Sequence, residues 1–110
     1  MDYTIEYYSD AVAEEILALP DTLAARYIVL TRRIAAVGPN LGPPHTDAFG
    51  EGLFELRLKG QEGIARVFFC ALVGRRVVML HCFVKKTQKT PPREIDIARK
   101  RMKEVKHAHP

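Results

Sequence analysis

Three strand-like runs between residues 52 and 85 constrain the fold more than any other feature of the sequence. The first run, GLFELRLK, alternates between apolar and charged side chains, as expected of a strand with one buried face. The second run, IARVFFCAL, is almost continuously apolar and indicates a central strand. Gly74 and Arg75 fit a tight turn into the third run, RVVMLHCFVK. Together the runs predict a small, mostly antiparallel sheet.

The alternation of the first run divides its side chains into an apolar face and a charged face. The apolar face holds Phe54, Leu56 and Leu58, and the charged face holds Glu55, Arg57 and Lys59. Arg66 lies in the apolar second run, where an unpaired buried charge would cost several kcal/mol. We therefore expect Arg66 either to pair with a carboxylate such as Glu55 or to point towards a ligand.

The residues before the sheet predict one strand and a helical hairpin. A strand is expected over residues 3–8, after which Ser9 can cap a first helix that Pro20 interrupts. Apolar residues of the second helix recur at helical spacing: Leu23, Tyr27, Leu30, Ile34 and Val37. Residues 38–50 are rich in proline and glycine and predict a loop. With the hairpin on one face of a four-stranded sheet, the opposite face is expected to be open to ligands.

A basic helix is predicted to end the chain, starting near Thr90 and Pro91 because threonine caps helices and proline suits their first turn. Its apolar stripe contains Ile95, Ala98, Met102 and Val105. The complete order is then β-α-α-β-β-β-α, an α+β fold in a single domain spanning residues 1–110.

Charge is unevenly distributed along the chain. Residues 1–50 carry a net charge of −4, residues 51–84 of +2 and residues 85–110 of +6. A basic end of this kind suggests an anionic partner such as nucleic acid, although a solvated tail is an equally good reading of composition alone. The sequence contains no metal-ligand motif and no nucleotide-binding loop, so no metal and no cofactor are expected. Without a signal peptide or an apolar run of about 20 residues, a cytoplasmic location without membrane contact is expected.

Four segments together resemble the RelE/ParE toxin superfamily, specifically its HigB-like, phage-associated branch: LFELR, ARVFF, VVMLHCFVKKTQKTP and REIDIARKRMKE. The most specific of them is FVKKTQKTP joined to the basic helix. The resemblance implies a RelE-like fold and the toxin of a type II toxin–antitoxin module. It also implies a ribosome-dependent endoribonuclease that cuts mRNA, and an antitoxin partner that commonly carries a helix-turn-helix domain.

The resemblance also implies which residues form the site. Metal-independent RNA cleavage uses the ribose 2′-hydroxyl as the nucleophile, and this family supplies much of the charge with arginine and lysine. Arg57, Lys85 and Lys86 match basic site positions, Arg66 would clamp the scissile phosphate, and His81 could supply acid–base chemistry. Residues expected to bind the RNA backbone are Lys59, Lys89, Arg93, Lys100 and Lys103.

Other interpretations remain open. Arg57 is also compatible with a surface ion pair to Glu55, Arg66 with an internal ion pair, and His81 with a packed, hydrogen-bonded histidine. Two other functions are compatible with the superfamily: a ParE-like inhibitor that binds DNA gyrase, and a non-catalytic partner that holds an antitoxin. A gyrase inhibitor would not need to gather Arg57, Arg66 and Lys85 around one phosphate.

Overall fold

The computed structural model describes residues 2–85 and 89–108. Within this part of the chain, five strands and three helices follow one another: β1 (Thr4–Tyr7), α1 (Asp10–Leu17), α2 (Asp21–Val37), β2 (Thr46–Gly50), β3 (Leu53–Gly60), β4 (Gly63–Leu72), β5 (Arg76–Lys85) and α3 (Pro92–Ala108). The predicted α+β class is confirmed. The order of elements differs from the prediction only by β2.

The strands form one sheet in the order β1-β5-β4-β3-β2, in which β1 runs parallel to β5 and the other pairs are antiparallel. The prediction of four strands is wrong because residues 46–50 pair with β3 instead of remaining a loop. β2 is short and mostly exposed, so it lacks the alternation that reveals a half-buried strand. Its first residue, Thr46, is nevertheless buried, and its Oγ1 accepts a hydrogen bond from Gly42 N at 2.9 Å.

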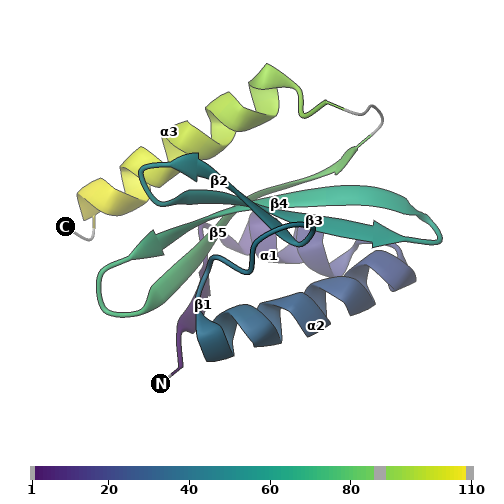
Figure 1. Ribbon diagram of the computed structural model, residues 1–110. Helices are drawn as coiled ribbons and strands as arrows, with labels where there is room; N and C mark the ends of the chain where they lie inside the picture. Colours follow the sequence, from purple (N-terminus) through teal and green to yellow (C-terminus); the bar gives the residue numbers. More distant parts are fainter. Residues whose placement is uncertain (1, 86–88, 109–110) are drawn as a thin grey trace.

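The helical hairpin covers one face of the sheet, and Figure 1 shows α1 and α2 on the opposite side of the strands from α3. Ser9 caps α1 as predicted, accepting from Val12 N at 3.2 Å. The apolar stripes of both helices pack against the inner residues of β3, β4 and β5 to form the larger core cluster. Leu56 and Leu58 are fully buried there, which confirms the register of β3. Val37 was expected in the stripe but is 74% exposed, because it is the last residue of α2.

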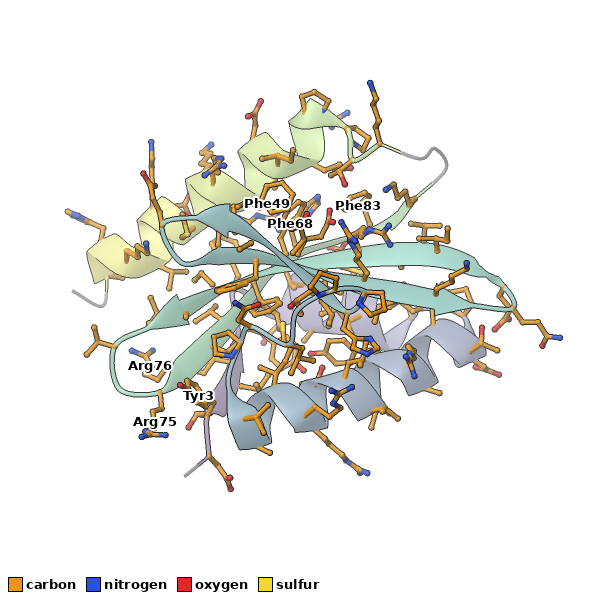
Figure 2. The ribbon with its side chains drawn as sticks, viewed as in Figure 1. Tyr3, Phe49, Phe68, Arg75, Arg76 and Phe83 are labelled. Carbon is orange, nitrogen blue, oxygen red and sulfur yellow. The ribbon has the colours of Figure 1, made fainter. Side chains whose placement is uncertain are left out.

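The opposite face is not open, because α3 packs across part of it. Ala98 and Met102 of the predicted stripe are buried in a second cluster with residues of β3, β4 and β5. Figure 2 shows Phe49 and Phe68 between the sheet and α3, and their rings meet edge to face at 5.4 Å. The expectation of an open face therefore holds only near the β3–β4 turn. In the described residues, no helix has the length and apolar character that crossing a membrane requires.

A β-bulge in β5 decides which side chains face α3. Phe68 pairs with His81 while Phe69 pairs with Met79, so Leu80 is the extra residue between them. Without the bulge, His81 would share a face with Met79, which belongs to the hairpin cluster. With the bulge, Leu80 stays on the α3 side with Val78, and the next residue, His81, lies on that side as well.

Candidate functional site

The charged face of β3 continues across β4 and β5, because paired strands in register place every second residue on the same face. Near the β3–β4 turn this produces a block of nine side chains that we call the charged grid. Its rows, read in the order β3, β4, β5, are Glu55–Phe68–His81, Arg57–Arg66–Phe83 and Lys59–Ile64–Lys85. The structure therefore brings together four residues predicted as catalytic and one predicted to bind RNA.

Glu55 is the shared counter-ion of the two grid arginines. Its side chain is only 2% exposed, and its Oε1 lies 3.5 Å from Nε of Arg57 and 3.5 Å from Nε of Arg66. Neither contact is aligned as a hydrogen bond, so both Nε groups are buried without an acceptor among the described residues. Thr90 donates to Oε2 of Glu55 at 2.7 Å. Glu55 was predicted on the open face, but it lies buried beneath the entry to α3.

The two arginines differ in how far they reach the surface. Arg57 is 38% exposed, and its Nη2 also lies 3.1 Å from Oδ2 of Asp47 on β2. Arg66 is 11% exposed, and its Nη1 donates to the carbonyl of Ala65 at 3.2 Å. Both ion pairs that the sequence left as structural alternatives are thus present. Each arginine is fixed at one end by a carboxylate, which holds the pair in a defined geometry.

Positive charge in the grid acts on its own members. Burial lowers the pKa of Lys85 from its ordinary value, and the guanidinium of Arg66 lowers it further, against an opposing effect of Glu55. Burial also lowers the pKa of Arg66, which Glu55 partly counteracts. An arginine stays protonated in proteins, whereas a lysine can lose its proton when its pKa falls. Among the arginines and lysines of the grid, Lys85 is therefore the one whose surroundings favour loss of its proton.

A cleft of about 490 Å³ opens beside the grid. Its lining is almost entirely basic: Arg26, Pro44, His45, Arg57, Lys59, Ile64 and Arg66. Within the described part of the chain, no carboxylate belongs to this lining. A cleft lined with cations focuses a positive potential and favours an anionic ligand.

His81 joins the sheet to the first turn of α3. Its Nε2 lies 2.9 Å from Oε1 of Glu94, while its Nδ1 is buried without a hydrogen-bond partner among the described residues. The ring also stacks on Phe83 at a centroid distance of 5.7 Å. With one nitrogen engaged and the other enclosed, the geometry favours a positioning role for His81 over direct contact with a ligand.

The basic residues of α3 fall into two groups. Three are engaged with the rest of the protein: Arg99 donates to the carbonyl of Phe49, Arg101 to that of Leu80 and Lys106 to that of Glu51. Three predicted RNA-binding residues, Arg93, Lys100 and Lys103, are exposed. Lys103 lies ten residues beyond Arg93, roughly 15 Å along the helix axis, so only Arg93 is close to the grid. Lys89 is exposed before the helix, and Lys86 lies outside the described residues.

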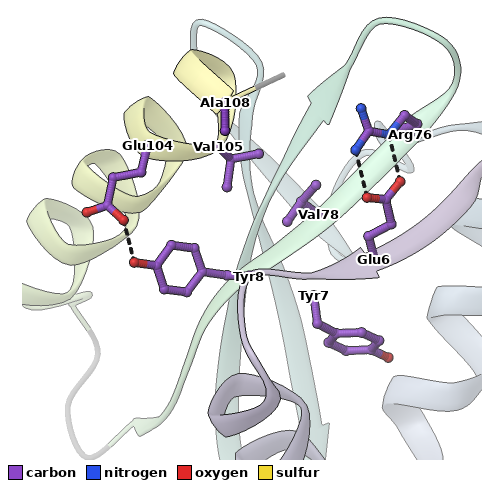
Figure 3. A pocket seen from close by; sticks show the side chains of 8 residues that line it. All are labelled: Glu6, Tyr7, Tyr8, Arg76, Val78, Glu104, Val105 and Ala108. Carbon is purple, nitrogen blue, oxygen red and sulfur yellow. Dashed lines mark hydrogen bonds and ion pairs between the residues drawn. The ribbon is translucent and has the colours of Figure 1, made fainter. Parts of the chain in front are cut away.

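A second pocket of about 230 Å³ lies at the far end of the α3 side, between β1 and the C-terminal turns of the helix. Figure 3 shows that its polar groups are already paired with one another. Arg76 donates to both oxygens of Glu6 at 2.7 Å, and Tyr8 donates to Glu104. This pairing leaves the basic cleft as the better candidate for an anion.

Several site residues could not be found from the sequence. Arg26 and His45 line the cleft, yet they belong to α2 and to the turn before β2. Glu94 and Thr90 hold the grid from α3 and the residues preceding it. Of these four residues, Glu94 alone offered a signal in the sequence, as the acidic residue in the first turn of a basic helix. The signal is ambiguous, because a carboxylate at that position also interacts favourably with the helix dipole.

Fold and site together define a small α+β protein of RelE-like architecture with a basic cleft on one side of its sheet. The family model described as phage derived protein Gp49-like (DUF891) matches residues 14–103. The chain belongs to this family, which is RelE-like and toxin-like, and the match does not distinguish the HigB-like branch. No curated protein matches the sequence.

Proposed function

We propose that this protein is the toxin of a type II toxin–antitoxin module and that it cleaves ribosome-bound mRNA at the charged grid. The observation that carries the proposal is the cross-strand pair Arg57–Arg66, fixed on Glu55 beside a cleft lined by cations. Membership of a phage-derived, RelE-like family supports the toxin assignment. The proposed partners are the ribosome with its mRNA and an antitoxin carrying a helix-turn-helix domain.

The proposed reaction uses the RNA as its own nucleophile. Lys85, whose pKa is lowered by burial and by Arg66, accepts the proton of the ribose 2′-hydroxyl. The 2′ oxygen attacks the neighbouring phosphorus, and the bond to the 5′ oxygen breaks. The 5′ oxygen takes a proton from water, and Lys85 returns its own proton to the hydroxide that remains. The products are a 2′,3′-cyclic phosphate on one fragment and a 5′-hydroxyl on the other. Arg57 and Arg66 stabilise the charge that develops on the phosphorane.

The surrounding residues keep the two arginines in place. Glu55 holds both side chains by their Nε ends, and His81 with Glu94 fixes the N-terminal turn of α3 beside them. Preorganised charges stabilise a transition state without reorganising at the moment of reaction. Arg93, at the start of α3, is placed to add a backbone contact to the RNA.

The proposal is tested by replacing Arg66 and assaying the purified protein on ribosomes programmed with a defined mRNA, using toe-printing to locate cuts. Removing one transition-state cation typically costs about 3–4 kcal/mol, so Arg66→Gln is expected to slow cleavage roughly a hundred- to thousandfold. Arg66→Lys, which keeps the charge but loses the planar fork, is expected to fall between Arg66→Gln and the wild type.

Thermal melting of both variants separates a chemical effect from a folding effect, because Arg66 also pairs with the buried Glu55. Cleavage at the wild-type rate by a folded Arg66→Gln protein would assign the arginine a purely structural role. Absence of any cut by the wild type, with DNA breaks on purified gyrase instead, would favour the ParE-like alternative.

A further inference from the structure

The basic cleft extends beyond the residues to which the proposed chemistry assigns a role. Its wall crosses from the α3 side of the sheet, with Lys59 and Arg66, to the hairpin side, with Arg26 of α2. The cleft can pass around the sheet here because β2 pairs with β3 only as far as Leu56. Beyond that point, a single further backbone bond among the described residues, from Arg57 N to His45 O at 2.8 Å, covers the edge of β3. Residues 58–60 therefore form a sheet edge at which groups from both faces meet.

Close packing of α2 against this edge brings Arg26 to the cleft. A Cβ on Gly60 would lie 2.5 Å from Oγ1 of Thr22, so the missing side chain lets the start of α2 approach the end of β3. Thr22 N also donates to Oε1 of Glu62 at 2.8 Å. Arg26 lies one helical turn beyond Thr22, on the same side of the helix.

The charges of the cleft are incompletely neutralised by the protein. Arg57 and Arg66 have Glu55 as counter-ion, and Arg57 also has Asp47. Among the described residues, neither Arg26 nor Lys59 forms a salt bridge. His45 belongs to the same lining, and its pKa is lowered by burial and by the positive charges of Arg33 and Arg26. An anion bound here would balance the charges of Arg26 and Lys59 and accept a hydrogen bond from His45.

We propose that Arg26, His45 and Lys59 form a second phosphate subsite, which binds a backbone phosphate of single-stranded RNA next to the one held by Arg57 and Arg66. The bound RNA would then run from the charged grid, over the exposed edge of β3, to the side of α2. A volume of about 490 Å³ lies within the range of pockets that enclose small ligands. This subsite extends the proposed function, since it gives the RNA a path through the same cleft.

The subsite is tested by RNA binding without cleavage. The probe is a single-stranded RNA of about 12 nucleotides carrying 2′-O-methyl groups throughout, which removes the nucleophile. Its affinity is measured by fluorescence anisotropy as a function of salt. Each phosphate contact to a single strand contributes about 0.7 to the slope of log affinity against log salt. Arg26→Ala and Lys59→Ala are each expected to lower the slope by about this amount.

The matched control is Arg32→Ala, an exposed arginine of the same helix that does not line the cleft. Its slope should equal that of the wild type. Equal losses for Arg26→Ala and Arg32→Ala would show a general effect of charge and overturn the subsite. A wild-type protein that does not bind the probe at low salt would overturn it as well. If the slopes change as expected but ribosome-bound mRNA is not cut, the subsite stands and the proposed reaction fails.

Discussion

The two faces of the sheet are both covered by helices, yet they treat charge differently. On the hairpin side, α1 and α2 enclose a continuous cluster that contains no charged residue. On the α3 side, the apolar cluster occupies one end and the charged grid the other, and they meet at the grid row of Glu55, Phe68 and His81, which is buried. Burying ionisable groups is costly unless they are paired. The difference indicates that the hairpin side stabilises the fold and that the charged end of the α3 side is kept for binding.

The largest effect is expected from the hairpin core. Leu30 of α2 is fully buried, and Leu→Ala in a core removes apolar contacts and leaves a cavity. Leu30→Ala should lower the free energy of unfolding by about 2–5 kcal/mol, measured by urea denaturation. Leu17→Ala is the matched control, since Leu17 on α1 is 81% exposed and should change stability by less than about 0.5 kcal/mol. Similar losses for both variants would contradict a hairpin-centred core.

A smaller loss of stability is expected at the charged grid, where the same change should increase the affinity for RNA. Glu55→Gln keeps the shape of the side chain but removes the charge shared by Arg57 and Arg66. Stability should fall by about 1.5–3 kcal/mol, while affinity for the methylated RNA should rise because two guanidinium groups lose their counter-ion. Asp47→Asn, at the half-exposed partner of Arg57, should cost at most about 1 kcal/mol. If Glu55→Gln weakens RNA binding in a folded protein, the grid does not bind phosphate as described.

Tyr7, the last residue of β1, and the following Tyr8 sharpen the comparison, because they face opposite sides of the sheet. Tyr7 shares a hydrogen bond with Tyr27 of α2 at 2.8 Å, whereas Tyr8 donates to Glu104 of α3. Tyr8→Phe should cost about 0.5–1 kcal/mol in thermal unfolding. Glu104→Gln combined with Tyr8→Phe should cost less than the sum of the two single changes. Full additivity would mean that this contact does not help to dock α3.

The smallest effect concerns pH. His45 faces Arg26 and Arg33 of α2, Arg57 and Lys59 of β3, and Arg66 of β4, and its pKa is lowered in the folded protein. His45 therefore takes up a proton more readily in the unfolded chain than in the folded protein. As the pH falls below the unfolded pKa of about 6.5 towards the lower folded pKa, protonation of the unfolded chain reduces the free energy of unfolding. His45→Asn should lose less stability than the wild type between about pH 7.5 and 5.5, measured by denaturation at each pH. Parallel curves would contradict the lowered pKa.

Most of the fold could be predicted because its strongest signals are periodic. The spacing of Leu23, Tyr27, Leu30 and Ile34 defined the buried stripe of α2, and the alternation of β3 correctly grouped Arg57 with Lys59. β2 could not be predicted, since a short exposed strand carries little hydrophobic pattern. The buried Glu55 accepts a hydrogen bond from Thr90, 35 residues away, and no local pattern records that contact.

The part of the site that could be predicted consists of residues on neighbouring antiparallel strands. Arg57, Arg66 and Lys85 lie on consecutive antiparallel strands, so their common face follows from register. His81 shares a face with Lys85 by the same alternation, because the bulge at Leu80 lies before both residues and leaves their grouping unchanged. Arg26 enters the cleft from α2 because of close packing at Gly60, a tertiary contact that sequence spacing does not reveal.

The most direct test of the charged grid as a ribonuclease site is the chemistry of the cut ends. Purified wild-type protein is incubated with ribosomes translating a defined mRNA, and the new 5′ ends are ligated with and without prior phosphorylation by a kinase. Attack by the 2′-hydroxyl predicts 5′-hydroxyl ends that ligate only after phosphorylation, paired with 2′,3′-cyclic phosphates on the upstream fragments. New ends that already carry a 5′-phosphate, or mRNA that stays intact, would contradict cleavage by Arg57, Arg66 and Lys85.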